Sequence, residues 1–159
     1  MRLSFITTVF NEQNTIIPFL CSIFAQSKLP DEIIIVDGGS TDNTLSEISK
    51  FKFPKIKKSP NIKILFKKGN RSMGRNKGIG SAKGEIILSS DAGNILDKYW
   101  IENITKPFSD KGIDVVAGYY KGISKNIFQK CLIPYTLVME DKINENEFLP
   151  ATRSMAFRK

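Results

Sequence analysis

Residues 31–42, which read DEIIIVDGGSTD, decide the fold. Their centre, residues 33–36, is an unbroken run of apolar β-branched side chains, and a polar turn with two glycines follows it directly. An unbroken apolar run suits a strand that is covered on both faces, as in a parallel sheet, because a strand with one face in water alternates with polar residues. The polar turn would then lie at the carboxyl end of a buried strand.

Segments of strand and helix character alternate outward from this run. Further strands are expected at residues 3–9, 62–66, 85–91, 115–119 and 153–157. Helices are expected at residues 16–24, 44–51, 99–105 and 126–139, while the glycines of residues 71–84 allow a helix there but weaken the expectation. The alternation predicts an α/β fold with a mostly parallel sheet flanked by helices.

The size and composition of the chain predict one domain. The chain has 159 residues, of which 41% are hydrophobic, and this is enough for a single core. The sequence has neither an apolar run of the roughly 18 residues that a membrane span needs nor the pattern of a signal peptide, so we expect a cytoplasmic protein. Cys21 and Cys131 lie in apolar stretches and are expected to be reduced, buried thiols.

Missing residues and motifs exclude several kinds of chemistry. The sequence contains no histidine, which removes Ser-His-Asp and Cys-His catalysis and the ordinary zinc sites. The first strand-to-helix turn, residues 9–13, has no glycine, and no glycine-lysine-serine or glycine-lysine-threonine triplet occurs, so dinucleotide-binding and P-loop motifs are absent. Acid, base or metal chemistry must therefore use carboxylates, which suit Mg²⁺ or Mn²⁺.

The positive charge is concentrated in one part of the chain. The net charge is +8, and the interval between Glu47 and Glu85 holds twelve of the 24 Lys and Arg residues without an Asp or Glu. This predicts a basic face. A solvated surface explains it as well as attraction for a diphosphate, an anionic membrane or nucleic acid does.

Polar side chains follow three of the expected strands. They are Asn11 and Glu12, residues 37–42, and residues 91–94. In open α/β sheets the binding crevice lies beyond the carboxyl ends of the strands. We therefore expect these three loops to meet and to carry the function.

Three segments together resemble one known family. They are SFITTVFNEQNTI at residues 4–16, DEIIIVDGGSTDNT at residues 31–44, and GRNKGIGSAKGEIILSSDAGNILDKYWIENI at residues 74–104. In order and separation they are similar to the family-2 inverting glycosyltransferases of the Rossmann-like GT-A fold. The resemblance covers roughly residues 2–105, with a weaker similarity in ATRSMAFRK at residues 151–159.

The resemblance implies a nucleotide site. Thr8, Phe10 and Glu12 match family residues that line the base and ribose. Asp37 matches an acid that recognises the base, and Arg75 would help to hold the nucleotide or its diphosphate.

The resemblance also implies a metal site, with departures. Asp91 matches the first acid of the family's Asp-x-Asp metal motif, but Gly93 stands where the second acid is expected. Asn94, Asp97, a backbone carbonyl or the diphosphate would have to complete the ligands of Mg²⁺ or Mn²⁺. Gly38 likewise replaces the second acid of the family's Val-Asp-Asp-Gly-Ser pattern.

The length of the chain is the largest departure. Family members carry their general base downstream of the segment that residues 154–158 resemble, and this sequence stops at Lys159. We therefore expect residues 1–159 to be a C-terminally truncated, single donor-binding domain whose general base lies beyond Lys159. Glu140 and Asp141 precede that segment in a charged stretch and are expected to be a surface pair.

The expected function is hexosyl transfer, with inversion, from a nucleoside diphosphate sugar to an acceptor hydroxyl. The donor would be UDP- or GDP-linked, the acceptor a glycan or a lipid-linked sugar, and the location cytoplasmic or peripheral at the inner face of the membrane. The alternatives are a nucleotidyltransferase-like enzyme, a non-catalytic nucleotide-binding domain and a nucleic-acid-binding module. Phe51, Phe53 and Phe66 lie among the lysines as a nucleic-acid binder would need, but they suit a core equally well, and nucleic acid is not the expected partner.

Overall fold

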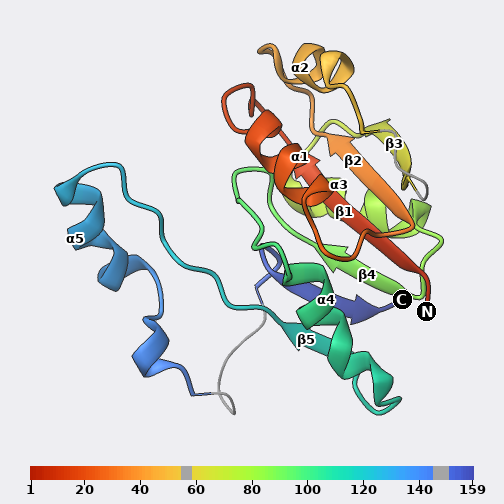
Figure 1. The fold of residues 1–159 in the computed structure, drawn as a ribbon. Helices are drawn as coiled ribbons and strands as arrows, with labels where there is room; N and C mark the ends of the chain where they lie inside the picture. Colours follow the sequence, from red (N-terminus) through yellow and green to blue (C-terminus); the bar gives the residue numbers. More distant parts are fainter. Residues whose placement is uncertain (55–58, 145–150) are drawn as a thin grey trace.

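The computed structural model describes residues 1–54, 59–144 and 151–159 (Figure 1). Within these residues, six strands form one sheet in the order β3-β2-β1-β4-β6-β5. The strands are β1 Leu3–Val9, β2 Glu32–Asp37, β3 Asn61–Phe66, β4 Ile86–Ser89, β5 Val115–Ala117 and β6 Met155–Arg158. Strands β3, β2, β1 and β4 run parallel, whereas β6 is antiparallel to both β4 and β5. The predicted α/β, mostly parallel sheet is confirmed.

Helices cover both faces of the sheet (Figure 1). Those that cover the sheet are α1 Ile16–Phe24, α2 Thr44–Lys50, α3 Arg71–Ser81 and α4 Trp100–Thr105. A further helix, α5 Ile127–Thr136, lies away from the sheet (Figure 1), and short 3-10 turns occur at Lys106–Ser109 and Glu140–Lys142. Side chains of α1, α2 and α4 pack with Phe5 and Ile33 into the larger core cluster. Helix α3 packs against the opposite face, where Ile6 and Val36 lie. The result is three layers with the sheet in the middle.

Burial explains why the centre of β2, residues 33–36, is apolar without interruption. All six of its residues, from Glu32 to Asp37, are buried, because β1 and β3 flank it and helices cover both of its faces. Ile33 and Ile35 belong to the cluster under α1, whereas Ile34 belongs to the cluster under α3. This confirms the interpretation of residues 33–36 as a strand with two covered faces.

The glycines of α3 allow the helix to lie close to the sheet. A Cβ added at Gly74 would lie 2.8 Å from the Thr8 Cγ2 atom, and one at Gly78 would lie 3.5 Å from Ile6. Glycine lowers intrinsic helix propensity, so the sequence of this segment does not by itself favour a helix. Here the packing of a helix that starts with an Asn70 cap, whose Oδ1 accepts the Met73 N–H, outweighs that cost.

Both cysteines correct a prediction. Cys21 and Cys131 are free and exposed, not buried. Cys21 lies on the outer side of α1, whose buried stripe consists of neighbouring positions such as Phe19 and Leu20. Cys131 lies on α5, a helix with no buried residue. Apolar surroundings in the sequence therefore did not mean burial in either case.

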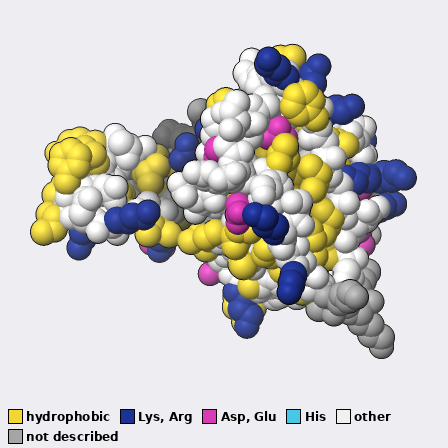
Figure 2. All heavy atoms as spheres, turned by 90° about the horizontal axis from the view of Figure 1, so that it is seen from above, with side chains coloured by type: hydrophobic (Ala, Val, Ile, Leu, Met, Phe, Trp, Pro, Cys, Tyr) yellow, Lys and Arg dark blue, Asp and Glu magenta, His cyan; other side chains and the backbone are white. Residues whose placement is uncertain are grey.

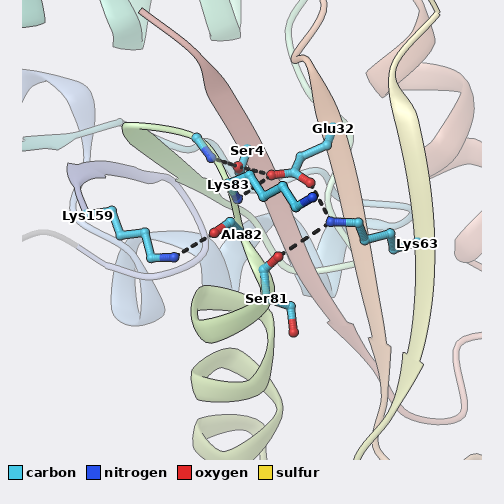
Figure 3. A network of polar contacts seen from close by, with 8 residues as sticks. Ser4, Glu32, Lys63, Ser81, Ala82, Lys83 and Lys159 are labelled. Atoms are coloured by element: carbon cyan, nitrogen blue, oxygen red, sulfur yellow. Dashed lines mark hydrogen bonds and ion pairs between the residues drawn. The ribbon is translucent and has the colours of Figure 1, made fainter.

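A buried carboxylate joins three strands at the opposite edge from the carboxyl ends (Figure 3). Glu32, at 0% exposure, accepts hydrogen bonds from the Ser4 hydroxyl at 2.6 Å and the Lys83 N–H at 2.5 Å. Its second oxygen pairs with the Lys63 Nζ at 2.8 Å. Burial raises the pKa of Glu32, but these hydrogen bonds and the Lys63 charge outweigh burial and lower the pKa to about 2.

No helix within the described residues is long and apolar enough to cross a membrane. Residues 118–144, which we call the arm, extend away from the layered body and carry α5 near their middle (Figure 1).

Candidate functional site

The carboxyl ends of β1, β2 and β4 lie along one edge of the sheet, as expected. The register pairs Val9 with Asp37 between β1 and β2, and Ile6 with Ser89 between β1 and β4. The loops that follow these strands therefore begin side by side, with the β1 loop in the middle. This edge is where an open α/β sheet binds its ligand.

The β1 and β2 loops are tied to each other by hydrogen bonds. Asn11 has a left-handed backbone (φ 57°), its N–H donates to the Ser40 Oγ at 3.0 Å, and its Oδ1 accepts the Thr41 N–H at 2.9 Å. The Glu12 N–H donates to the Thr44 Oγ1 at 2.7 Å. Asparagine tolerates the left-handed region better than most residues, so the sequence supports this turn locally. The two loops form one preorganised rim.

Asp42 strengthens the same rim. It accepts hydrogen bonds from the Thr44 hydroxyl at 2.5 Å, the Thr44 N–H at 2.9 Å and the Gln13 N–H at 3.2 Å. Burial raises the pKa of Asp42, but these hydrogen bonds outweigh it and the net pKa is lowered. The carboxylate therefore stays charged and fixes the start of α2 to the β1 loop.

Asp37, predicted to contact the base, has its carboxylate inside its own turn. The side chain is 1% exposed; Oδ2 accepts the Gly39 N–H at 3.0 Å, and the Ser40 N–H lies 3.2 Å from both oxygens. Gly39 has a φ of 102°, a conformation that other residues rarely adopt. Asp37 thus shapes the β2 part of the rim.

The three β1 residues of the predicted nucleotide site lie in different environments. Thr8 is half-buried against Gly74 of α3, and Phe10 is 58% exposed just beyond the strand. Glu12 accepts a short hydrogen bond from the Thr15 hydroxyl at the start of α1. Phe10 therefore offers an aromatic face to a ligand, while Thr8 and Glu12 are held by the protein.

Asp91 is paired with arginines from α3. The Arg75 Nη2 lies 2.7 Å from the Asp91 Oδ1, and the Arg71 Nη1 lies 3.9 Å from the Asp91 Oδ2. Arg71 and Arg75 are four residues apart, so they lie on one face of the helix. The Arg75 side chain is 18% exposed and the Asp91 side chain 24% exposed, so this pair is partly shielded from water.

The β4 loop is anchored to the returning strand. Ser90 and Asn94 both donate to the Arg153 carbonyl oxygen, from the hydroxyl at 3.0 Å and from Nδ2 at 3.0 Å respectively. The Arg153 guanidinium lies over the Tyr120 ring, 4.8 Å from its centroid. These contacts connect the surroundings of Asp91 to the base of the arm.

The carboxylates at this edge fit a metal ion in one way only. Among the described residues, no group of three or more acidic or cysteine side chains could enclose a metal ion. Mg²⁺ keeps several waters and is commonly bound through one or two carboxylates together with substrate phosphates. Asp91 fits a cation that a diphosphate shares with it, and does not fit a protein-only metal cage.

The structure brings together some of the predicted residues and adds one. Arg75 and Asp91 are in contact, and the loops of Glu12 and Asp37 are hydrogen-bonded neighbours. Arg71 was missed, although its four-residue spacing from Arg75 is visible in the sequence. Glu140 pairs with the Lys121 Nζ at 2.6 Å on the arm, with both side chains more than 60% exposed at 68% and 66%, as expected for a surface pair.

The aromatic residues among the lysines divide into two groups. Phe51 and Phe53 pack against Phe24 of α1, with ring centroids 6.0 and 5.7 Å from it. Phe66 is 64% exposed at the end of β3. Phe51 packs against the core, and Phe53 packs on Phe24 and Phe51 beside it. These contacts remove most of the aromatic support for a nucleic-acid surface.

Comparison with known proteins agrees with this geometry. The sequence profile described as Glycosyl transferase family 2 matches residues 4–156. The chain belongs to this family. It is 30% identical over 120 residues to the glycosyltransferase GlyG of Streptococcus pneumoniae, an alignment that covers 74% of this chain and 38% of GlyG. The chain thus spans well under half the length of that relative.

Solved structures share the fold of this glycosyltransferase domain. The mannosyltransferase PcManGT of Pyrobaculum calidifontis, solved with GDP-Man and Mn²⁺, superposes with a TM-score of 0.72 at 20% identity, covering 99% of this chain and 44% of that protein. S. aureus TarS, solved with UDP-GlcNAc, gives a TM-score of 0.65 at 25% identity, covering 79% of this chain and 36% of that protein. The predicted family and its GT-A fold are confirmed.

Proposed function

We propose that residues 1–159 form the donor-binding domain of an inverting glycosyltransferase. It binds a nucleoside diphosphate sugar at the carboxyl ends of β1, β2 and β4, and the hexosyl group passes to an acceptor hydroxyl. One observation carries the proposal: Asp91, Arg75 and Arg71 form a charged cluster at the end of β4, beside the joined β1 and β2 loops. Family membership supplies the reaction class.

The base and ribose would lie on the rim made by the β1 and β2 loops. Phe10 is the exposed aromatic residue there and would stack on the base. Thr8 and Glu12 would flank the ribose. Asp37 would act on the base through the turn that it shapes as well as through any direct contact, because its oxygens already accept two N–H groups.

The diphosphate would lie against Arg75 and Arg71. A leaving nucleoside diphosphate gains negative charge in the transition state, and fixed cations near its oxygens stabilise that charge. Asp91 would hold Mg²⁺ or Mn²⁺, and a bound cation supplies further stabilisation of the same charge. In the structure, Arg75 and Asp91 form an ion pair with each other. When a diphosphate and its cation bind, two pairs would replace this one: Arg75 with the diphosphate, and Asp91 with the cation.

The general base is proposed to come from outside the described residues. Inverting transfer needs a carboxylate that accepts the proton of the acceptor hydroxyl. Glu140 is paired with Lys121 on the arm, so it is a poor candidate. The domain would therefore bind and orient the donor, and further chain would complete the acceptor side.

Relatives and charge support the proposed donor and acceptor. TarS was solved with UDP-GlcNAc and PcManGT with GDP-Man, and these structures support a UDP- or a GDP-linked sugar as the donor of this chain. A glycan or lipid-linked sugar is the proposed acceptor. The twelve Lys and Arg residues between Glu47 and Glu85 support a position at the cytoplasmic face of a membrane.

Thermal-shift measurements with UDP, GDP and their sugars, with and without Mn²⁺, test the proposal. Ligand that binds the folded state raises the Tm by mass action. We expect a diphosphate to stabilise the protein more with Mn²⁺ than without it. Asp91→Asn should abolish the Mn²⁺ increment, and Arg75→Gln should weaken diphosphate binding by about tenfold, the equivalent of one charge-assisted hydrogen bond.

Lys77→Gln is the matched control, because Lys77 lies exposed on the same helix. It should leave diphosphate binding unchanged. Oligonucleotide binding with a steep salt dependence, and no response to any nucleoside diphosphate, would refute the donor site and favour a nucleic-acid-binding module.

A further inference from the structure

Both carboxylate oxygens of Asp91 face an arginine. The Asp91 Oδ1 lies 2.7 Å from the Arg75 Nη2, and the Asp91 Oδ2 lies 3.9 Å from the Arg71 Nη1. The Arg75 side chain is largely shielded from water and donates a hydrogen bond, whereas the Arg71 side chain is exposed and adds a charge that water screens. The oxygens that would bind a metal ion therefore already face cations of the protein itself.

The charge of this cluster disfavours a metal ion that arrives alone. One carboxylate and two guanidinium groups give a net positive charge. A bare Mg²⁺ or Mn²⁺ would have to displace Arg75 from Asp91, and the displaced guanidinium would be left uncompensated beside a second cation. The wider electrostatic field acts in the same direction, because the net charge of the chain is +8 and Lys and Arg predominate among the charged side chains on the face seen in Figure 2.

The neighbouring acids do not remove this cost. Position 93, where a second carboxylate would lie two residues after Asp91, is a glycine. The Asp97 Oδ1 accepts the Tyr99 N–H at 2.9 Å, and both oxygens of Asp37 accept N–H groups of its own turn. Binding of a cation at the end of β4 therefore depends on Asp91.

A diphosphate that arrives alone meets the converse cost. To pair with phosphate oxygens, Arg75 would have to leave Asp91, and the carboxylate would then be unpaired beside a second anion. When a diphosphate and a cation arrive together, Arg75 pairs with the first and Asp91 with the second, so neither side chain loses its partner. Each ligand thus removes the competitor of the other.

We propose that the Arg75–Asp91 ion pair is a latch that makes the binding of a divalent cation and of a diphosphate conditional on each other. Linkage is reciprocal, so the factor by which the diphosphate raises cation affinity equals the factor by which the cation raises diphosphate affinity. The latch rests on the proposed donor site and goes beyond it, because a metal site without a latch would bind Mn²⁺ before any diphosphate is present.

Substitution of either latch residue should improve the binding of one ligand. Arg75→Gln removes the competitor of the cation, so Mn²⁺ alone should bind about tenfold more tightly than it binds the parent, although a diphosphate binds more weakly. Asp91→Asn keeps the shape of the side chain and frees Arg75, so inorganic pyrophosphate without metal should bind about tenfold more tightly, although the effect of Mn²⁺ is lost. Two residues that only bound their ligands would give losses in both variants.

Electron paramagnetic resonance measures the cation, because free Mn²⁺ gives a sharp signal that bound Mn²⁺ loses. Isothermal titration calorimetry measures pyrophosphate with and without Mn²⁺, after correction for the complex that the two form in solution. In the parent, each ligand should raise the affinity of the other by the same factor. In Arg75→Gln this factor should be about tenfold smaller, because only the direct attraction between Mn²⁺ and pyrophosphate remains.

Lys77→Gln is the matched control, since Lys77 lies exposed on the same helix and its substitution removes the same charge. It should leave the affinities for Mn²⁺ and for pyrophosphate within about twofold of the parent. Arg71→Gln should raise Mn²⁺ affinity less than Arg75→Gln does, because the Arg71 contact is longer and exposed. Circular dichroism and the Tm without ligand check the folding of each variant, and Arg75→Gln and Asp91→Asn test the latch independently of each other.

Three results would overturn the latch. Arg75→Gln could bind Mn²⁺ no more tightly than the parent does, Asp91→Asn could bind metal-free pyrophosphate no more tightly, or Lys77→Gln could match the gain of Arg75→Gln, which would assign the gain to overall charge. Failure of the proposed donor site would look different. In that case UDP and GDP would bind no more tightly than pyrophosphate in the presence of Mn²⁺, while the gains in the two latch variants would persist.

Discussion

Asp37 is the last residue of β2 and Asp91 lies just beyond the end of β4, yet their side chains have different partners. Asp91 faces two arginines of another element, whereas both oxygens of Asp37 accept N–H groups of its own turn. The sequence predicted both as acids at strand ends, because position along a strand is a local property. Which partners each carboxylate meets depends on the packing of α3 and on the turn after Asp37, and neither is visible from a single residue.

The charge state of Glu32 contributes to the stability of the fold. Its pKa is lowered from 4.5 to about 2 in the folded protein, so the folded state favours the carboxylate more than the unfolded chain does. The resulting stability is complete above pH 4.5 and is lost as the pH falls from 4.5 towards about 2. Glu32→Gln should lower the free energy of unfolding at neutral pH by about 2 kcal/mol, since the charged contact to Lys63 is lost.

Urea unfolding of the parent, Glu32→Gln and Glu85→Gln at several pH values measures this effect. Glu85 is an exposed carboxylate just before β4, so its substitution should change stability by less than about 0.5 kcal/mol. The difference in free energy of unfolding between the parent and Glu32→Gln should become smaller as the pH is lowered. A gap that stays constant down to acidic pH would show that Glu32 acts through shape and not through charge.

At the scale of elements, α3 shows where local sequence rules gave way to packing. Its glycines weakened the expected helix, yet Gly74 and Gly78 are buried and bring the helix onto β1 and β2. The same close approach places Arg71 and Arg75 beside Asp91. Propensity describes a helix in isolation, and so it could not anticipate that the glycines of α3 let the helix pack closely on the sheet.

Substitutions in α3 should separate these two roles of glycine. A Cβ at Gly80 meets nothing within 4 Å, so Gly80→Ala should stabilise the protein by up to about 1 kcal/mol through helix propensity alone. A Cβ at Gly74 would lie 2.8 Å from Thr8, so Gly74→Ala should lower the Tm despite the same gain in propensity. Calorimetry of both variants checks the signs, and a rise in Tm for both would mean that α3 has room to move off the sheet.

For the whole molecule, the parallel part of the sheet followed from the sequence, whereas the arm did not. Continuous apolar runs predict β2 and β4 locally, and the polar residues that follow β1, β2 and β4 mark where these strands end. The family match confirmed the resemblance found in those segments. The arm was expected as an ordinary helical stretch at residues 126–139, and α5 does occur at Ile127–Thr136. Helical spacing of apolar residues predicts a helix but does not say whether its apolar side meets the body, and here it does not.

The difference in burial between the arm and the body predicts which segment unfolds locally first. Helix α5 has no buried residue, whereas the body is held by the sheet and by the bonded rim. Segments with little buried surface open at low free-energy cost, and a protease cuts them from the open state. Limited chymotrypsin digestion should therefore cut after Phe128 and Tyr135 about tenfold faster than after Phe10 and Phe66, although all four side chains are exposed.

The nicked protein should keep its sheet. Strand β6 follows the arm in sequence but pairs with both β4 and β5. Just after β6, the Lys159 N–H donates a further hydrogen bond to the Glu85 carbonyl oxygen at 3.0 Å. Mass spectrometry of the first fragments, with circular dichroism before and after digestion, checks both points. First cuts after Phe10 or Phe66 would mean that the rim opens more readily than the arm, and loss of the sheet signal after arm cleavage would mean that the arm holds β6 in place. If neither occurs, the arm is a separable appendage on a self-sufficient body, because the strands on either side of it are joined to each other and not through it.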